Sequence, residues 1–418
     1  MRTWLPTWDV DHLDLVDADH PLPSPVSEQT VDRARRYRLS RLKTLMRAHD
    51  CPAMLLYDPV NIYYALDVTN MNVWMHHNSS HYALVFADGP AIDFVYKGAE
   101  HIAARSPLVN EARIATNFIY LYGGDVELRA AHWAAEIVGL LKEHGDGRVR
   151  LAVDKCEPPA LMALQRLGVE VVEGQQITEH ARSIKSPDEI ELMVWSVRVC
   201  EAALERMRRR SEPGRSEIEI WAELHHENIR YGGEYIETRL LSSGSRTNPW
   251  YHQASDRVVE AGDVVAVDCD MIGPYGYCAD LSRSWTAGRT DPTPAQRDLY
   301  RHAVDQIEHN TSLLRPGLSY LEFNERSWRI PERFVARNYG LAFHGVGMAD
   351  EWPSVPTHPF WGAGSFSPPD GELEPGMVVC VESLVALDGV GESIKLETQV
   401  LVTDDGHVRL DRFPWETW

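Results

Sequence analysis

The stretch "VDCDMIGPYGYCAD", residues 267–280, places three carboxyl groups close together. Asp268 and Asp270 stand two positions apart, and Asp280 follows ten positions after Asp270. Side chains two apart in a strand point to the same face, and the intervening "GPYG" favours a turn that would bring Asp280 back to them. Carboxylates brought together repel one another, and a bound cation removes that cost. The segment therefore indicates either a metal site or a solvated hairpin tip that carries a few acids.

Three later segments hold further side chains that can bind a metal. "FHGVG" sets His344 between small residues, "CVES" puts Glu382 at the end of an apolar strand, and "SIKLETQVLV" puts Glu397 inside another. A lone histidine is more often a core or surface residue than a ligand. Burying an unpaired glutamate is expensive, although strand alternation could turn Glu397 outward. In chain order the six residues run Asp, Asp, Asp, His, Glu, Glu.

The first half of the chain predicts an α/β domain over residues 31–184, behind an extended arm at residues 1–30 that is rich in Pro, Asp and Trp. A helix is expected in "RARRYRLSRLKTLMRAHD", with leucines and a methionine at helical spacing. Strand-like runs follow and alternate with helices, as in an α/β fold. These runs lie at 53–57, 81–87, 91–96 and 149–154.

The second half predicts a separate α+β domain over residues 185–418. In "SIKSPDEIELM", Ser186 and Glu189 form a capping box and Pro187 suits the first turn of a helix. A second helix is expected at 216–231, before the pattern changes to strands and turns. The strands are "VVAVDCDM", "YCADLSRSWTA", "MVVCVESLVAL" and "SIKLETQVLVT".

Composition excludes several classes of protein. A chain of 418 residues predicts two domains. Its net charge of -21 opposes binding to nucleic acid or to anionic membranes. No apolar run has membrane-spanning length, and the first residues lack the pattern of a signal peptide. The six cysteines form no CxxC pair, so we expect free thiols and a cytoplasmic location.

The order of acids and histidine resembles the creatinase/aminopeptidase P/prolidase superfamily, the pita-bread metal enzymes. The matching stretches are "DxD…GYCADLSRSW", "HGVG", "EPGMVVCVE" and "IKLETQVLVTDDG". The resemblance covers about residues 185–410, and a creatinase-like N-terminal domain fits about 35–180. It implies two metal ions, about 3.5–4 Å apart, held by Asp268, Asp280, His344, Glu382 and Glu397. Hard oxygen ligands with one imidazole suit Mn, Fe, Co or Zn.

Several positions depart from the peptidases of this superfamily. Asp270 stands where they usually have a small residue, and the interval from Asp268 to Asp280 is one position longer. After "HGVG" they usually carry a His-Glu pair, whose His helps to stabilise the tetrahedral intermediate of peptide hydrolysis, and this chain has Asp350-Glu351. These departures resemble the DddP-type dimethylsulfoniopropionate (DMSP) lyases. The resemblance adds Asp270 to the ligands and favours iron, and its spacing pattern fits Asp268, Asp270, Asp280, Tyr339, His344, Asp350, Glu382 and Glu397.

The lyase resemblance implies a β-elimination that converts DMSP to dimethyl sulfide and acrylate. Asp350 is the expected general base, and Tyr339 is expected to orient the substrate carboxylate. A sulfonium favours an aromatic wall, which Trp250, Tyr251 or Trp74 would supply. The superfamily also implies a homodimer in which N-terminal aromatic residues help to close the partner's site.

Two other functions remain open from the sequence. One is hydrolysis of Xaa-Pro peptides or of a small amidine or amide, as in creatinase, and the Asp350 substitution argues against it. The other is a catalytically inactive binding protein, and the complete set of ligands argues against it.

Overall fold

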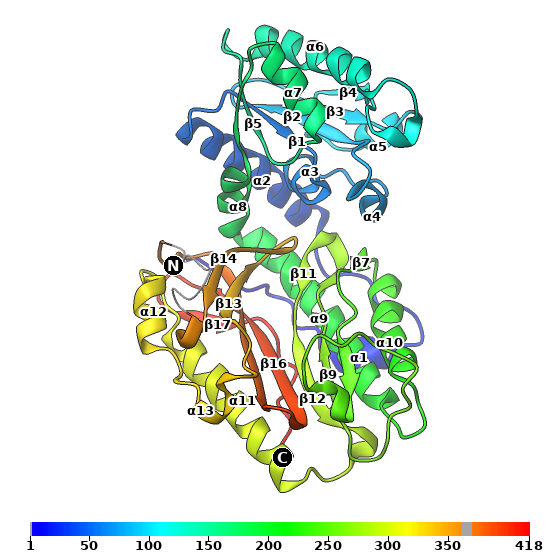
Figure 1. Cartoon of the computed structure of the whole chain (residues 1–418), viewed down its shortest axis with the longest axis vertical. Coiled ribbons are helices and arrows are strands. Elements are labelled where there is room, and N and C mark those ends of the chain that lie inside the picture. Colours follow the sequence, from blue (N-terminus) through cyan, green and yellow to red (C-terminus); the bar gives the residue numbers. More distant parts are fainter. Residues whose placement is uncertain (1, 361–369) are drawn as a thin grey trace. The chain divides into compact units, whose positions relative to one another are not determined.

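The chain folds into two compact units. The computed structural model describes residues 2–360 and 370–418, and divides them into Val31–Arg182 and a second unit of Ser183–Trp418 with the N-terminal segment up to Thr30. Figure 1 shows their elements in sequence colours.

The unit Val31–Arg182 is built on one mixed six-stranded sheet, in the order β4-β3-β2-β1-β5-β6. The expected strands and the first helix are confirmed. The strands are β1 (Ala53–Leu56), β2 (Tyr82–Phe86), β3 (Ala91–Val95), β4 (Glu111–Ile114), β5 (Arg150–Val153) and β6 (Glu170–Glu173). The helices are α2 (Glu28–Ala48), α3 (Pro59–Leu66), α4 (Asn72–Met75), α5 (Glu100–Ala103), α6 (Val126–His144), α7 (Pro158–Arg166) and α8 (Gln175–Ser183).

Alternate residues of these strands form the core of this unit. Tyr82, Phe86 and Phe94 are fully buried and cluster with Trp133 and Ile137 of α6. The Tyr82 and Phe94 rings stack with centroids 4.5 Å apart. The period-two pattern of the strands therefore fixes which face of the sheet receives α6.

The other unit, which contains the predicted metal ligands, has three sheets. Their strand orders are β11-β10-β7, β12-β9-β8 and β14-β13-β15-β16-β17. The short strands are β7 (Tyr235–Ile236), β8 (Leu241–Ser243), β9 (Val264–Asp268), β10 (Met271–Ile272), β11 (Cys278–Ala279) and β12 (Ser282–Thr286). The five-stranded sheet contains β13 (Leu341–Val346), β14 (Asp350–Pro356), β15 (Val378–Leu387), β16 (Val390–Val402) and β17 (His407–Arg409).

Helices surround these sheets in the same unit (Figure 1). They are α1 (His12–Asp17), α9 (Pro187–Arg210), α10 (Glu217–Arg230), α11 (Pro294–Leu313), α12 (Tyr320–Arg326) and α13 (Glu332–Val335). The predicted capping box is present at α9, since the Ser186 side chain accepts from the Glu189 N–H and the Glu189 side chain accepts from the Ser186 N–H. The extended-arm prediction missed α1, which Asp11 caps and which buries Leu15 and Val16.

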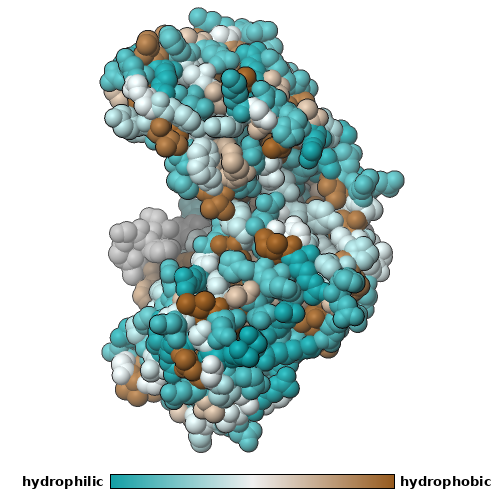
Figure 2. Space-filling model, turned by 90° about the vertical axis from the view of Figure 1, so that its right-hand side faces the viewer, coloured by the Kyte–Doolittle hydropathy of each residue, from teal (hydrophilic) through white to brown (hydrophobic). Residues whose placement is uncertain are grey.

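The surface of the molecule is mostly hydrophilic on the face that Figure 2 draws. In Figure 2, hydrophobic residues are scattered over this face in small groups. None of the helices in the described part of the chain combines the length and the apolar character needed to cross a bilayer.

Candidate metal centre

The three aspartates meet where β9 ends and β12 begins. β9 and β12 pair in antiparallel register, with Asp268 opposite Ser282, and the predicted hairpin is confirmed. The expectation that one continuous strand aligns Asp268 and Asp270 is wrong, because β9 ends at Asp268 and Asp270 has a φ of 37°. Thr238 Oγ1 donates to Asp270 Oδ2 over 2.5 Å and holds this carboxylate in place. The three carboxylates still each place an oxygen within 4.8 Å of the others.

His344, Glu382 and Glu397 come from three neighbouring strands of the five-stranded sheet. Glu382 lies directly opposite Glu397 in the β15–β16 register, inside its strand and not at its end as expected. His344 lies on β13, beside β15. Its Nε2 is 3.2 Å from Glu397 Oε1, and 3.4 Å from both Asp280 Oδ2 and Glu382 Oε1. Three carboxylates thus converge on one imidazole nitrogen.

The small residues of "HGVG" permit a close approach of the neighbouring strand. A Cβ at Gly345 would lie 2.3 Å from the Trp352 carbonyl oxygen, and one at Gly347 would lie 2.5 Å from Glu351 Oε1. Only glycine therefore allows β14 to pack this tightly on the strand that carries His344.

Burial rules out a solvated hairpin tip. The six predicted ligands are between 1% and 7% exposed. Donor atoms of five of them form two groups that share Asp280, one with Asp268 and Asp270 and the other with His344, Glu397 and Cys380, and Glu382 belongs to neither group. Cys380 was not predicted. Its position two residues before Glu382, on the same strand face, was the available signal.

Lys395 is a second residue that sequence reasoning missed. Its fully buried Nζ lies 2.9 Å from both Glu382 Oε2 and Glu397 Oε2, and 3.4 Å from Asp268 Oδ2. It also donates to Ser282 Oγ over 2.8 Å. Lys395 precedes Glu397 by two positions in β16, so strand alternation places both on one face.

The charges of this cluster are unbalanced. Burial raises the pKa of Asp268 to about 6 and that of Glu382 to about 8, and it raises the pKa values of Asp270 and Asp280 well above their usual range. Burial acts on Glu397 too, but Lys395 and His344 outweigh it and hold the pKa of Glu397 low. The ammonium and the imidazole thus stabilise one carboxylate, and the others lack a sufficient counter-charge.

The arrangement fits divalent metal ions. Asp280 Oδ1 and Glu382 Oε1 are buried and have no hydrogen-bond partner among the described residues. Oxygen donors dominate, with one imidazole, and this set suits first-row transition metals. A cation placed among the carboxylates would balance their negative charge and would also bind the two oxygens that lack a hydrogen-bond partner.

Asp350 lies beside this cluster but has a different environment. It begins β14, its side chain is 46% exposed, and its Oδ1 is 3.7 Å from His344 Nδ1. Partial desolvation raises the pKa of Asp350, and the nearby imidazole opposes the rise. Glu351 is buried instead and forms an ion pair with Lys185, so it does not share the open position of Asp350.

The predicted aromatic contacts separate into exposed and buried rings. The ring centroid of Tyr339 lies 5.0 Å from Lys395 Nζ and 6.0 Å from the ring centroid of Tyr251. Tyr251 is 63% exposed. Trp250 is buried in the hydrophobic core. Trp74 belongs to the other unit, where its ring meets Tyr96 edge-on.

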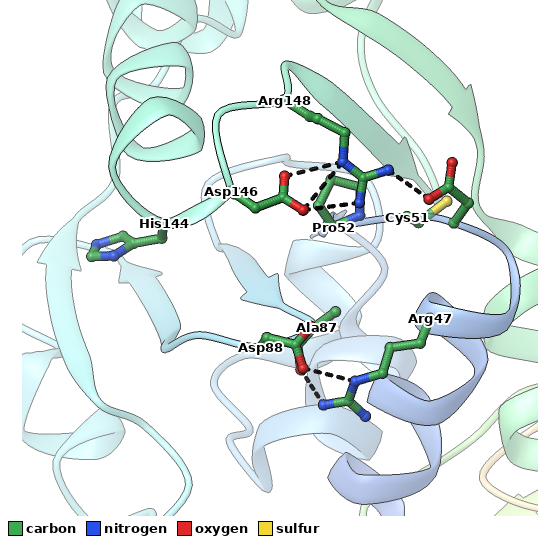
Figure 3. Close-up of a pocket in the computed structure, with 10 residues that line it drawn as sticks. Arg47, Cys51, Pro52, Ala87, Asp88, His144, Asp146 and Arg148 are labelled. Carbon is green, nitrogen blue, oxygen red and sulfur yellow. Dashed lines mark hydrogen bonds and ion pairs between the residues drawn. The ribbon is translucent and has the colours of Figure 1, made fainter.

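A charged surface pocket in the unit Val31–Arg182 is drawn in Figure 3 and is separate in the fold from these ligands. Arg148 pairs there with Asp50 and Asp146, and Arg47 pairs with Asp88. Because these opposite charges neutralise one another, the pocket has no evident chemistry of its own.

Known proteins resemble this chain along most of its length. A dimethylsulfoniopropionate lyase DddP of Roseovarius nubinhibens is 42% identical over 392 residues, which is 92% of this chain and 87% of that protein. A protein of the same name from Roseobacter denitrificans is 41% identical over 91% of this chain and 86% of its own length. The solved Xaa-Pro dipeptidase of Bacillus anthracis superposes with a TM-score of 0.72 at 21% identity, covering 91% of this chain and 99% of that one.

Two families match successive parts of the sequence. Residues 38–184 match the creatinase/prolidase N-terminal domain, and residues 191–404 match metallopeptidase family M24. The two family matches and the structural likeness confirm the expected fold, a creatinase-like N-terminal domain followed by a pita-bread catalytic domain. The chain therefore belongs to metallopeptidase family M24 and carries a creatinase/prolidase N-terminal domain.

Proposed function

We propose that this protein is a metal-dependent carbon–sulfur lyase that cleaves DMSP to dimethyl sulfide and acrylate. The observation that carries the proposal is the Asp350 carboxylate, which is half-exposed at the rim of a buried acidic cluster. The lyases named DddP, at 41–42% identity, support the same reaction.

The proposed elimination requires a base and little else from the protein's side chains. Asp350 removes a proton from the carbon next to the substrate carboxylate. The electron pair of that C–H bond forms the C=C bond of acrylate, and the C–S bond breaks with its electrons going to sulfur. The products are neutral dimethyl sulfide, acrylate and the proton on Asp350. Dimethyl sulfide leaves readily from the sulfonium as a neutral molecule, so no side chain has to protonate it.

The metal ligands in this proposal are Asp268, Asp270, Asp280, His344, Glu382 and Glu397. Metal ions held there would supply positive charge that binds the substrate carboxylate and stabilises the developing enolate-like charge. We infer two ions, with iron as the first choice and Mn, Co or Zn as alternatives. The buried, poorly compensated carboxylates of the cluster support this inference.

Aromatic residues are proposed to hold the two ends of the substrate. Tyr339 lies close to both Lys395 and Tyr251, so its hydroxyl suits the carboxylate end. The exposed Tyr251 ring is a better wall for the sulfonium than the core residue Trp250. Trp74 remains a proposed contact from the partner's N-terminal domain.

The proposal extends to organisation and location. We infer an arm at 1–30, an N-terminal domain at 31–184 and a catalytic domain at 185–418. We also infer a homodimer and no nucleic-acid partner. Sedimentation that shows an active monomer would contradict the homodimer. All six cysteines are free, which suits a reducing cytoplasm.

Substitution of the proposed base tests this function. Purified protein supplied with DMSP should release dimethyl sulfide, measured by gas chromatography. Asp350→Asn keeps the shape and removes the base, so turnover should fall by at least about a hundredfold while metal content stays unchanged. Asp405→Asn, which alters an exposed carboxylate in a surface turn, is the matched control and should retain activity.

Two results would contradict the proposal. Near-normal turnover by Asp350→Asn would assign the proton transfer to another group. Release of proline-containing products from Xaa-Pro peptides, without dimethyl sulfide from DMSP, would instead favour the hydrolase alternative.

A further inference from the structure

The thiol of Cys380 faces the acidic cluster and not the hydrophobic core. Cys380 lies on β15, opposite His344 on one side and Gln399 on the other. Its neighbours Val379 and Val381 point into the core. Strand alternation therefore turns Cys380 to the same face as Glu382, so it is not simply a small core residue.

The position of the sulfur is that of a metal donor. Cys380 is fully buried, and its Sγ belongs to a group with atoms of Asp280, His344 and Glu397 that all lie within 4.8 Å of one another. Among the described residues, its one hydrogen bond is a long contact of 3.7 Å in which the thiol donates to the Asp280 carbonyl oxygen. A weak contact of this kind gives the thiol little reason to occupy a polar site.

A second cysteine, Cys278, shows that a position near these acids in the sequence does not by itself place a sulfur among the potential ligand atoms. Cys278 is also fully buried, two positions before Asp280. Among the described residues, however, its sulfur joins neither group of potential ligand atoms. Cys278 is therefore a matched comparison for Cys380, with the same chemistry and a different position.

We propose that Cys380 is a further metal ligand, which binds the ion held by Asp280, His344 and Glu397. The S–H bond breaks and a sulfur–metal bond forms, and the released proton passes to the solvent without any change in the oxidation state of sulfur. A thiolate among oxygen donors favours softer ions, so the site should prefer Fe²⁺, Co²⁺ or Zn²⁺ over Mn²⁺. This inference rests on the proposed metal centre but not on the substrate.

Spectroscopy of the full-length protein tests the sulfur bond directly. Protein loaded with Co²⁺ should show a sulfur-to-cobalt charge-transfer band in the near ultraviolet. X-ray absorption of the Zn²⁺ form should show a sulfur neighbour at about 2.3 Å from the metal. Cys380→Ser should lose both signals, whereas Cys278→Ser should keep them.

A metal competition provides the second measurement. The ratio of Zn²⁺ to Mn²⁺ affinity should fall by at least about tenfold in Cys380→Ser, because even the loss of an outer-shell partner typically costs about 10–100-fold in affinity. Cys278→Ser should leave the ratio near that of the unmodified protein.

The inference is overturned if the unmodified protein shows no metal–sulfur signal, or if Cys380→Ser retains it. Should Cys380→Ser fail to fold, X-ray absorption of the unmodified protein still decides the question. None of these measurements uses DMSP. A protein without lyase activity that shows the sulfur signal would contradict the proposed function and leave this inference standing.

Discussion

The buried ion pair between Lys185 and Glu351 gives a quantitative prediction. The side chains are 2% and 0% exposed, and the two residues lie 166 positions apart in the chain. Replacing Glu351 by Gln removes one charge and leaves the Lys185 ammonium buried next to a neutral group. Removing one partner of a buried pair typically costs about 3–5 kcal/mol. We therefore expect Glu351→Gln to lower the free energy of unfolding by an amount in this range.

Urea unfolding, followed by circular dichroism, measures this loss against two comparisons. Asp388→Asn breaks an ion pair with Arg337 in which the side chains are 66% and 36% exposed, and it should cost at most about 1 kcal/mol. Lys185→Met combined with Glu351→Leu removes both charges, and should recover most of the loss because no charge remains buried alone.

The ion pair should also influence catalysis, because Glu351 and Asp350 are neighbours at the start of β14 and point to opposite faces. Replacement of Glu351 should therefore disturb the position of Asp350, and should lower kcat more than it raises KM in the DMSP assay. The reasoning is refuted if Glu351→Gln is no less stable than Asp388→Asn. It is also refuted if the double variant is destabilised as much as Glu351→Gln or more.

Two further predictions concern the ligands and the pH dependence of stability. Asp280→Ala and Glu397→Ala should lose bound metal and DMSP cleavage together, and full metal occupancy by elemental analysis in both variants would contradict the ligand assignment. Burial acts to raise the pKa of Asp411, but Arg283 and Arg409 outweigh it and hold this pKa below the usual 3.8. A lowered carboxyl pKa contributes stability above the unfolded pKa and loses it as the pH falls through the folded value. Asp411→Asn should thus be clearly less stable than the unmodified protein at pH 7, and urea midpoints should converge as the pH falls below about 4.

Much of the site follows from chain order and strand periodicity. Glu382 and Glu397 each stand in an apolar run, and the structure places those runs in adjacent strands with the two carboxylates opposite each other. The helix start at Ser186 follows from the capping box, which depends on local hydrogen bonds alone. Features determined by residues close in sequence were therefore predictable.

Features that depend on distant parts of the chain were not. Lys395 and Cys380 each stand two positions before a predicted ligand, which predicts a shared strand face, but their contacts with the other acids depend on the pairing of β15 and β16. The left-handed backbone at Asp270 could not be predicted either. The spacing of Asp268 and Asp270 in the sequence is the same whether or not the strand is interrupted between them. Glu351 could have been an alternative base by sequence, until its pairing with Lys185 placed it in the interior.

The strands of the five-stranded sheet serve the core and the site through alternate residues. Val379 and Val381 pack into the core. Cys380 and Glu382, which alternate with them along β15, point to the opposite face, where the acidic cluster lies. The apolar positions hold the strands in register, and this register buries Glu382 directly opposite Glu397. Burial, and then the neighbouring carboxylate, raise the pKa of Glu382. Without a cation, these acids oppose the stability that the core provides. Binding of metal ions would remove this opposition, so the features that make the cluster costly to fold also make it a strong site for metals.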